Sequence, residues 1–197
     1  MVRAVTEHVP TAAVGRRTFG ENGALGMALF VFTEVMLFAG FISAFVIVRS
    51  NAPLGTWPPP GQPRLPVERT ALNTLALLLS GVALYVAGRR HRRGEGGAGA
   101  WMGAALALGA AFVLLQGAEW LALLRSGFTL TSSQLGSFFY LIIGAHALHA
   151  VGAILALALA WRARLAGRLT ETRLAAVQLF WYFVVLVWPL IYWKVYW

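Results

Sequence analysis

The stretch from Gly127 to Gly152, GFTLTSSQLGSFFYLIIGAHALHAVG, decides the fold. It begins as a polar turn and becomes a long apolar run, whose middle carries His146 and His149. An imidazole in hydrocarbon is costly without a partner, so we expect both histidines to face other polar groups. The best partners on offer are two lone carboxylates in other apolar runs, Glu34 and Glu119. The stretch therefore predicts a bundle of spans that closes around a polar interior.

The composition indicates an integral membrane protein. Of the 197 residues, 59% are hydrophobic and 12% are charged, whereas soluble domains carry about 25% charged residues. The mean hydropathy is +0.70. The apolar runs are continuous and do not alternate, so they predict helices and exclude a β-barrel. The chain has no cysteine, which excludes iron–sulfur clusters, c-type haem attachment, thiolate copper sites and disulfides.

The apolar runs predict an all-α, polytopic membrane bundle of five transmembrane helices: Gly23–Val48, Thr70–Ala87, Ala100–Leu124, Gly136–Trp161 and Leu174–Tyr196. The predicted organisation is a cytoplasmic N-terminal arm over residues 1–22 and one five-helix bundle over residues 23–197, without an internal repeat. The arm is polar and shows no signal peptide, so we expect the first span to act as its own insertion signal. Pro189 predicts a kink in the last span.

The basic residues predict the orientation in the membrane. The formal net charge of +9 does not indicate nucleic-acid binding, because the basic residues stand in short clusters between spans. Eleven arginines fall in the arm and in the second and fourth loops: Arg3, Arg16, Arg17, Arg89, Arg90, Arg92, Arg93, Arg162, Arg164, Arg168 and Arg173. Five basic residues fall on the other side: Arg49, Arg64, Arg69, Arg125 and Lys194. The excess predicts a cytoplasmic N-terminus and an external C-terminus.

The candidate site is an intramembrane polar cluster, which either handles protons or fixes the helix register: Glu34, Gln116, Glu119, His146 and His149. An ionised carboxylate in mid-bilayer costs about 2.5–3.5 kcal/mol, so we expect each carboxylate to be protonated, paired or beside water. Two histidines three residues apart on one helix point the same way and cannot clamp a haem from opposite sides. The two histidines and the two carboxylates could together bind one metal ion, but interhelical hydrogen bonds are the simpler interpretation. We predict no catalytic, cofactor-binding or metal-binding residue in this chain.

Two further patterns concern the surface of the bundle. Small residues in the first span would allow a neighbouring helix to approach closely: Gly26, Ala39, Gly40, Ser43 and Ala44. Aromatic residues at the end of the last span predict an anchor at the membrane interface: Tyr192, Trp193, Tyr196 and Trp197. Thr131, Ser132 and Ser133 are candidate N-caps for the fourth span.

Five motifs in order resemble subunit III of haem–copper respiratory oxidases, in a short five-span form. They are Thr33–Phe41 (TEVMLFAGF), Leu72–Leu75 (LNTL), Gln116–Trp120 (QGAEW), the run of Phe128–Leu130, Gly136–Phe139 and His146–His149, and Trp181–Trp188. The resemblance covers Gly26 to Trp197. It implies an accessory subunit without haem or copper that packs on the catalytic subunit I and near subunit II. This subunit would stabilise subunit I during turnover and support proton uptake, while the complex reduces oxygen with electrons from cytochrome c or quinol.

This sequence departs from the family pattern in two places. The family's last helix usually carries a histidine and an aspartate, where this chain has Tyr182 and Val185. Longer members also have two more N-terminal spans, which form one wall of a lipid-holding cleft. Bound phospholipid is expected from the family, and its place in this chain is open.

Two other functions compete with this interpretation. The first is an accessory subunit of a nitric oxide reductase, whose motifs overlap with those of the oxidases. The second is a free-standing proton-coupled transporter, which predicts inverted repeats and broken helices. The resemblance places the chain in the bacterial cytoplasmic membrane, among lipids and oxidase subunits.

Overall fold

The chain forms five long helices and, within the described residues, no strand. The computed structural model describes residues 19–53, 56–59 and 65–197. The helices are α1 (Phe19–Ser50), α2 (Val67–Arg92), α3 (Ala98–Arg125), α4 (Gln134–Leu165) and α5 (Glu171–Tyr196). Each contains a window long and apolar enough to cross a membrane. The predicted fold class, an all-α five-span membrane bundle, is confirmed.

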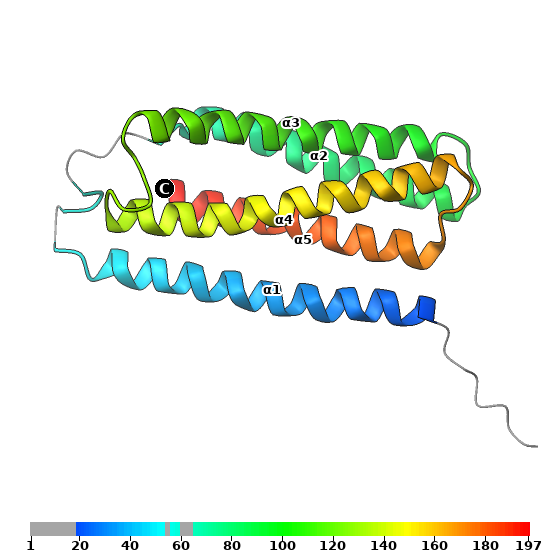
Figure 1. The fold of residues 1–197 in the computed structure, drawn as a ribbon, viewed down its shortest axis with the longest axis horizontal. Coiled ribbons are helices and arrows are strands. Elements are labelled where there is room, and N and C mark those ends of the chain that lie inside the picture. Colours follow the sequence, from blue (N-terminus) through cyan, green and yellow to red (C-terminus); the bar gives the residue numbers. More distant parts are fainter. Residues whose placement is uncertain (1–18, 54–55, 60–64) are drawn as a thin grey trace, which may run out of the picture.

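The five helices lie side by side along one long axis (Figure 1). Helix α5 is central and packs against α1, α2 and α4, while α3 packs against α2 and α4. Helix α1 contacts only α5 and α4 among the described helices, so it stands at one edge of the bundle. The start of α1 and the C-terminus lie at opposite ends of the bundle, as an odd number of spans requires.

The helices are longer than the predicted spans, and α2 differs most. The sequence predicts Thr70–Ala87, whereas the helix begins at Val67 and ends at Arg92. Arginines and a histidine fill its last turn, where positive charge is favourable beside the free carbonyl groups of a helix C-terminus. Among the three candidate caps of α4, Ser133 takes the role, and its hydroxyl accepts a hydrogen bond from the amide of Gly136 at 3.0 Å.

Helix α5 is held to α2 by a series of hydrogen bonds that are buried or partly buried. Trp181 Nε1 donates to Ser80 Oγ at 3.2 Å, and Trp188 Nε1 donates to Thr74 Oγ1 at 2.8 Å. Tyr192 donates to the carbonyl of Val67 at 3.0 Å. Hydrogen bonds between spans contribute about 0.6 kcal/mol each on average, so this series fixes the register of α5 more than it adds stability.

The outer surface of the bundle is apolar. Leucines on three helices are largely exposed, including Leu72 at 73%, Leu114 at 74% and Leu148 at 74%. A surface of this kind is stable only against lipid or another protein. The chain is therefore a multi-pass membrane protein.

Candidate functional site

The five polar residues of the predicted cluster do not meet at one point. Glu34 of α1 contacts His149 of α4, and Gln116 and Glu119 of α3 belong to a second group beside α2 and α5. His146 lies apart from both carboxylates and is 1% exposed. The predicted residues thus divide into two separate polar groups and one isolated buried histidine.

Glu34 and His149 form a short contact between α1 and α4. The Nε2 atom of His149 lies 3.0 Å from Oε2 of Glu34, and their side chains are 13% and 17% exposed. The other ring nitrogen, Nδ1, lies 2.7 Å from the carbonyl oxygen of Ala145. A carbonyl cannot donate, so Nδ1 carries the proton of this hydrogen bond. Oε2 of Glu34 has no hydrogen-bond partner among the described residues, so its approach to Nε2 is a contact at ion-pair distance and not a hydrogen bond.

Aromatic rings surround the Glu34–His149 pair. The rings of Phe38 and Phe183 lie 5.6 and 5.7 Å from the His149 ring, centroid to centroid. Phe30 and Phe180 lie at 6.2 and 6.3 Å. Such surroundings provide little solvation, which strengthens electrostatic attraction between the two side chains. The sequence predicts at least one contact between a carboxylate and an imidazole, and this pair is that contact.

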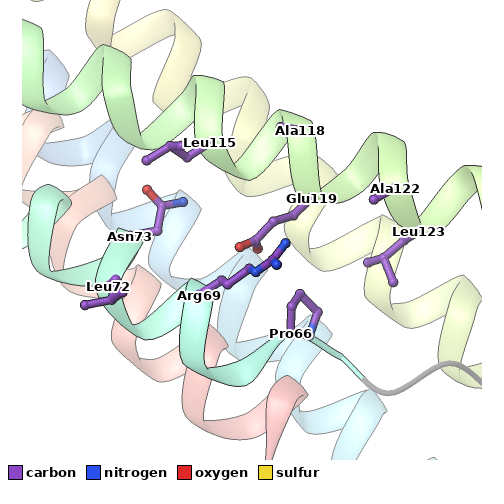
Figure 2. Close-up of a pocket in the computed structure, with 9 residues that line it drawn as sticks. All are labelled: Pro66, Arg69, Leu72, Asn73, Leu115, Ala118, Glu119, Ala122 and Leu123. Carbon is purple, nitrogen blue, oxygen red and sulfur yellow. The ribbon is translucent and has the colours of Figure 1, made fainter.

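The second group joins α2, α3 and α5 near one end of the bundle. Oε2 of Glu119 accepts from Thr70 Oγ1 at 2.9 Å and from Gln116 Nε2 at 3.4 Å. Gln116 Nε2 also donates to Tyr196 Oη at 3.2 Å, and Asn73 Nδ2 donates to Gln116 Oε1 at 3.2 Å. Figure 2 shows Asn73 and Glu119 on the facing sides of α2 and α3. The hydrogen-bond partners of Glu119 are thus neutral, Arg69 attracts it electrostatically, and no histidine is among these residues.

Three members of this group are not among the predicted site residues: Thr70, Asn73 and Tyr196. Thr70 was expected to start a span, and Tyr196 was expected in the interfacial anchor. Tyr196 is instead 8% exposed and buried against Gln116, whereas Trp193 and Trp197 at 61% and 68% are exposed as an anchor would be. The spacing of Thr70 and Asn73, three residues apart on one helix face, is the signal that could have placed Thr70 here.

His146 does not have the carboxylate partner that the sequence predicts. Neither ring nitrogen has a hydrogen-bond partner within the described part of the chain. Its ring instead packs on Trp188 with centroids 4.9 Å apart, and Phe112 and Phe38 lie at 6.3 Å. A cavity of about 180 Å³ adjoins it between α3, α4 and α5. The prediction of a carboxylate contact is wrong for this histidine, because the neighbouring helices present aromatic rings to it.

The two carboxylates are held by different helices and different partners, so they do not assemble with both histidines around one point. Among the described residues, no group of three or more His, Asp or Glu side chains is close enough to hold a metal ion. The arrangement suits hydrogen bonding between spans and a polar contact between Glu34 and His149.

The two positions that depart from the family pattern have clear local roles. Tyr182 Oη accepts a hydrogen bond from Gln178 Nε2 at 3.3 Å. Val185 is 4% exposed and packs on Gly81. A Cβ atom added at Gly81 would lie 3.1 Å from Cγ1 of Val185. A carboxylate in place of Val185 would be buried against this glycine.

Comparison with known proteins identifies the family. The profile of cytochrome c oxidase subunit III matches residues 11–197. Cytochrome c oxidase subunit 3 of Synechocystis is 31% identical over 195 residues, which cover 96% of this chain and 81% of that protein. The same subunit of Aepyceros melampus is 34% identical over 201 residues, 96% of this chain and 72% of that protein. With a match over nearly its whole length, the chain belongs to the cytochrome c oxidase subunit III family.

Proposed function

We propose that the chain is the accessory subunit III of a proton-pumping haem–copper oxidase that reduces oxygen to water. Membership of the subunit III family supports this function. In this proposal haem and copper belong to catalytic subunit I and to subunit II, and electrons from cytochrome c or quinol do not pass through this chain. The nitric oxide reductase and transporter alternatives are not favoured by the family match.

The observation that carries the proposal is the uncovered face of α1. Phe38 and Phe45 of α1 turn inward and are each 1% exposed. The opposite face carries exposed apolar side chains, including Leu29 at 60%, Phe32 at 63% and Met36 at 60%. On this face a Cβ added at Gly26 or Gly40 would have no atom within 4 Å. Small residues on an open face permit close helix approach in lipid, so this face suits docking onto catalytic subunit I.

The second part of the proposal concerns protons. The Glu34–His149 pair lies on the α1 side of the bundle, beside the proposed docking face. A polar pair at this position would stabilise the packing against subunit I. It would also supply polar side chains near the proton uptake route of subunit I. Glu34, Gln116, Glu119, His146 and His149 are accordingly proposed as packing and proton-support residues, without a catalytic role.

The proposed location is the bacterial cytoplasmic membrane, with the N-terminus in the cytoplasm. The excess of arginines in the arm and in the α2–α3 and α4–α5 connections supports this orientation. Arg49 and Arg69 then lie at the outer end of the bundle.

The test is to purify the oxidase with and without this chain and to compare haem content, initial rate and decay of the rate. We expect equal haem and copper content and a comparable initial rate, followed by faster loss of activity without the chain. Loss of a haem signal in proportion to the chain would contradict the accessory role. An unchanged decay would remove the protective role.

A further inference from the structure

A groove runs along the lipid-facing side of α2 and α3, near the end of the bundle that holds the C-terminus. It has a volume of about 560 Å³. Its walls are apolar, with Leu72, Leu115, Ala118 and Leu123 among the lining residues. Figure 2 shows these side chains on both sides of the opening, with Arg69 and Glu119 between the two helices. An apolar trough with charges at one end has the polarity pattern of a lipid.

The charges lie at the depth of lipid headgroups. Arg69 is the third residue of α2, and Glu119 lies six residues before the end of α3 at Arg125. With a rise of about 1.5 Å per residue, Glu119 is about 9 Å below the helix end. Leu72 and Leu115 continue the groove toward the middle of the bilayer. The charged end therefore faces the headgroup region, and the apolar walls face the acyl chains.

Arg69 and Glu119 lie beside each other at this end of the groove. Arg69 is exposed and attracts Glu119 electrostatically, although no hydrogen bond or close ion pair to its guanidinium is present in the described part of the chain. Both hydrogen bonds to Glu119 reach Oε2, which leaves Oε1 free of them. The Asn73 side chain is 3% exposed and lines the groove, and its Oδ1 has no hydrogen-bond partner among the described residues. A polar occupant at this end would give Oδ1 of Asn73 a partner and would add contacts at Arg69 and at Oε1 of Glu119.

The balance of charge selects the kind of headgroup. Arg69 supplies one positive charge, while Glu119 and the adjacent Glu68 are carboxylates, and Glu68 lines a neighbouring hollow together with Arg69. An anionic headgroup would be attracted by one arginine and repelled by two carboxylates. A zwitterionic headgroup can place its phosphate on Arg69 and its ammonium against the carboxylates. Guanidinium and phosphate form strong charge-assisted hydrogen bonds.

We propose that this groove binds one phosphatidylethanolamine molecule. The phosphate lies on Arg69, the ammonium group lies toward Glu119 and Glu68, and one acyl chain lies between Leu72 and Leu115. The site is on the α2–α3 face and does not involve the docking face of α1, so it can be tested independently of the proposed function.

The experiment uses the intact oxidase complex that contains the full chain. After delipidation, the complex is supplied with phosphatidylethanolamine or phosphatidylglycerol of the same acyl composition, and bound lipid is counted by native mass spectrometry. Two variants remove the site in different ways: Arg69→Gln removes the phosphate contact, and Ala118→Trp fills the groove from an exposed position. The matched controls are Arg125→Gln, at the same end of the bundle, and Leu114→Trp, one turn away on α3; neither lines the groove.

We expect the unmodified complex to hold one more phosphatidylethanolamine than the Ala118→Trp complex. Arg69→Gln should weaken retention about five-fold, as the loss of one arginine near a membrane surface does. Both controls should retain the lipid, and free phosphoethanolamine should not displace it. Equal retention in all variants, a preference for phosphatidylglycerol, or displacement by phosphoethanolamine alone would overturn the proposal. A photo-crosslinker at Leu115 should label lipid, and labelling of a polypeptide would equally overturn it.

Discussion

Nε2 of His149 lies 3.0 Å from Oε2 of Glu34, and this contact is one of two polar side-chain links between α1 and the other described helices. The second link is Arg49 Nη2, which donates to the main-chain oxygen of Trp197 at 2.9 Å. Because α1 packs only on α5 and α4, it relies on few contacts within the chain. The Glu34–His149 pair therefore anchors the helix that we propose to meet the catalytic subunit.

The first prediction concerns the carboxyl group of Glu34. Glu34→Gln should be mild, because the amide can still donate to Nε2 of His149. Glu34→Leu should cost about 1–3 kcal/mol in the free energy of unfolding, since it leaves a buried imidazole nitrogen unpaired. Denaturant titration of the purified chain measures both. Glu68→Leu, at an exposed carboxylate, is the control.

The same two variants separate packing from proton handling. If Glu34→Gln assembles normally and lowers the number of protons pumped per electron in the oxidase, the pair supports proton movement. If pumping and its decay are unchanged, the pair serves packing alone. Equal stability of the Gln and Leu variants would show that the contact between Glu34 and His149 does not stabilise the bundle.

The second prediction compares the two histidines. His146→Phe should leave the free energy of unfolding unchanged or raise it, because His146 has no hydrogen bond to lose and lies beside a cavity of about 180 Å³. His149→Phe should lower it by about 1–3 kcal/mol, because it leaves Glu34 without its partner. Parallel denaturant titrations would show the difference. A larger loss at His146 than at His149 would show that His146 has a partner outside this chain.

The third prediction compares two glycines that differ in their surroundings. A side chain at Gly109 would overlap the ring of Trp181, so Gly109→Leu should destabilise the bundle by about 1–3 kcal/mol through overpacking. Gly40 faces open space, so Gly40→Leu should leave unfolding unchanged. In the complex, however, Gly40→Leu should lower the recovery of this chain with the catalytic subunit. Normal recovery would remove α1 as the docking face.

The fourth prediction is the orientation. A fluorescent reporter that matures only in the cytoplasm should stay dark when fused after Trp197 and should fluoresce when fused ahead of Met1. The reason is the excess of arginines on the side of the N-terminus. Fluorescence from the C-terminal fusion would reverse the proposed topology.

The sequence by itself determined the five spans, because hydropathy over about 20 residues is a local property. It also determined the family, because motifs such as Thr33–Phe41 and His146–His149 are local strings that need no partner to be recognised. Exact helix ends were less well predicted. Helix α2 continues to Arg92 because its basic last turn is stable at the membrane interface, which a hydropathy window does not capture.

Only the tertiary structure decided which polar groups meet. Residues three apart on a helix differ by about 60° in direction, so His149 reaches Glu34 on α1 while His146 turns toward Trp188 on α5. Likewise Glu119 contacts Thr70 and Gln116, and no histidine, because α3 packs beside α2. These pairings depend on which helices are neighbours and how each is rotated, and both are set by the packing of large side chains across the whole bundle.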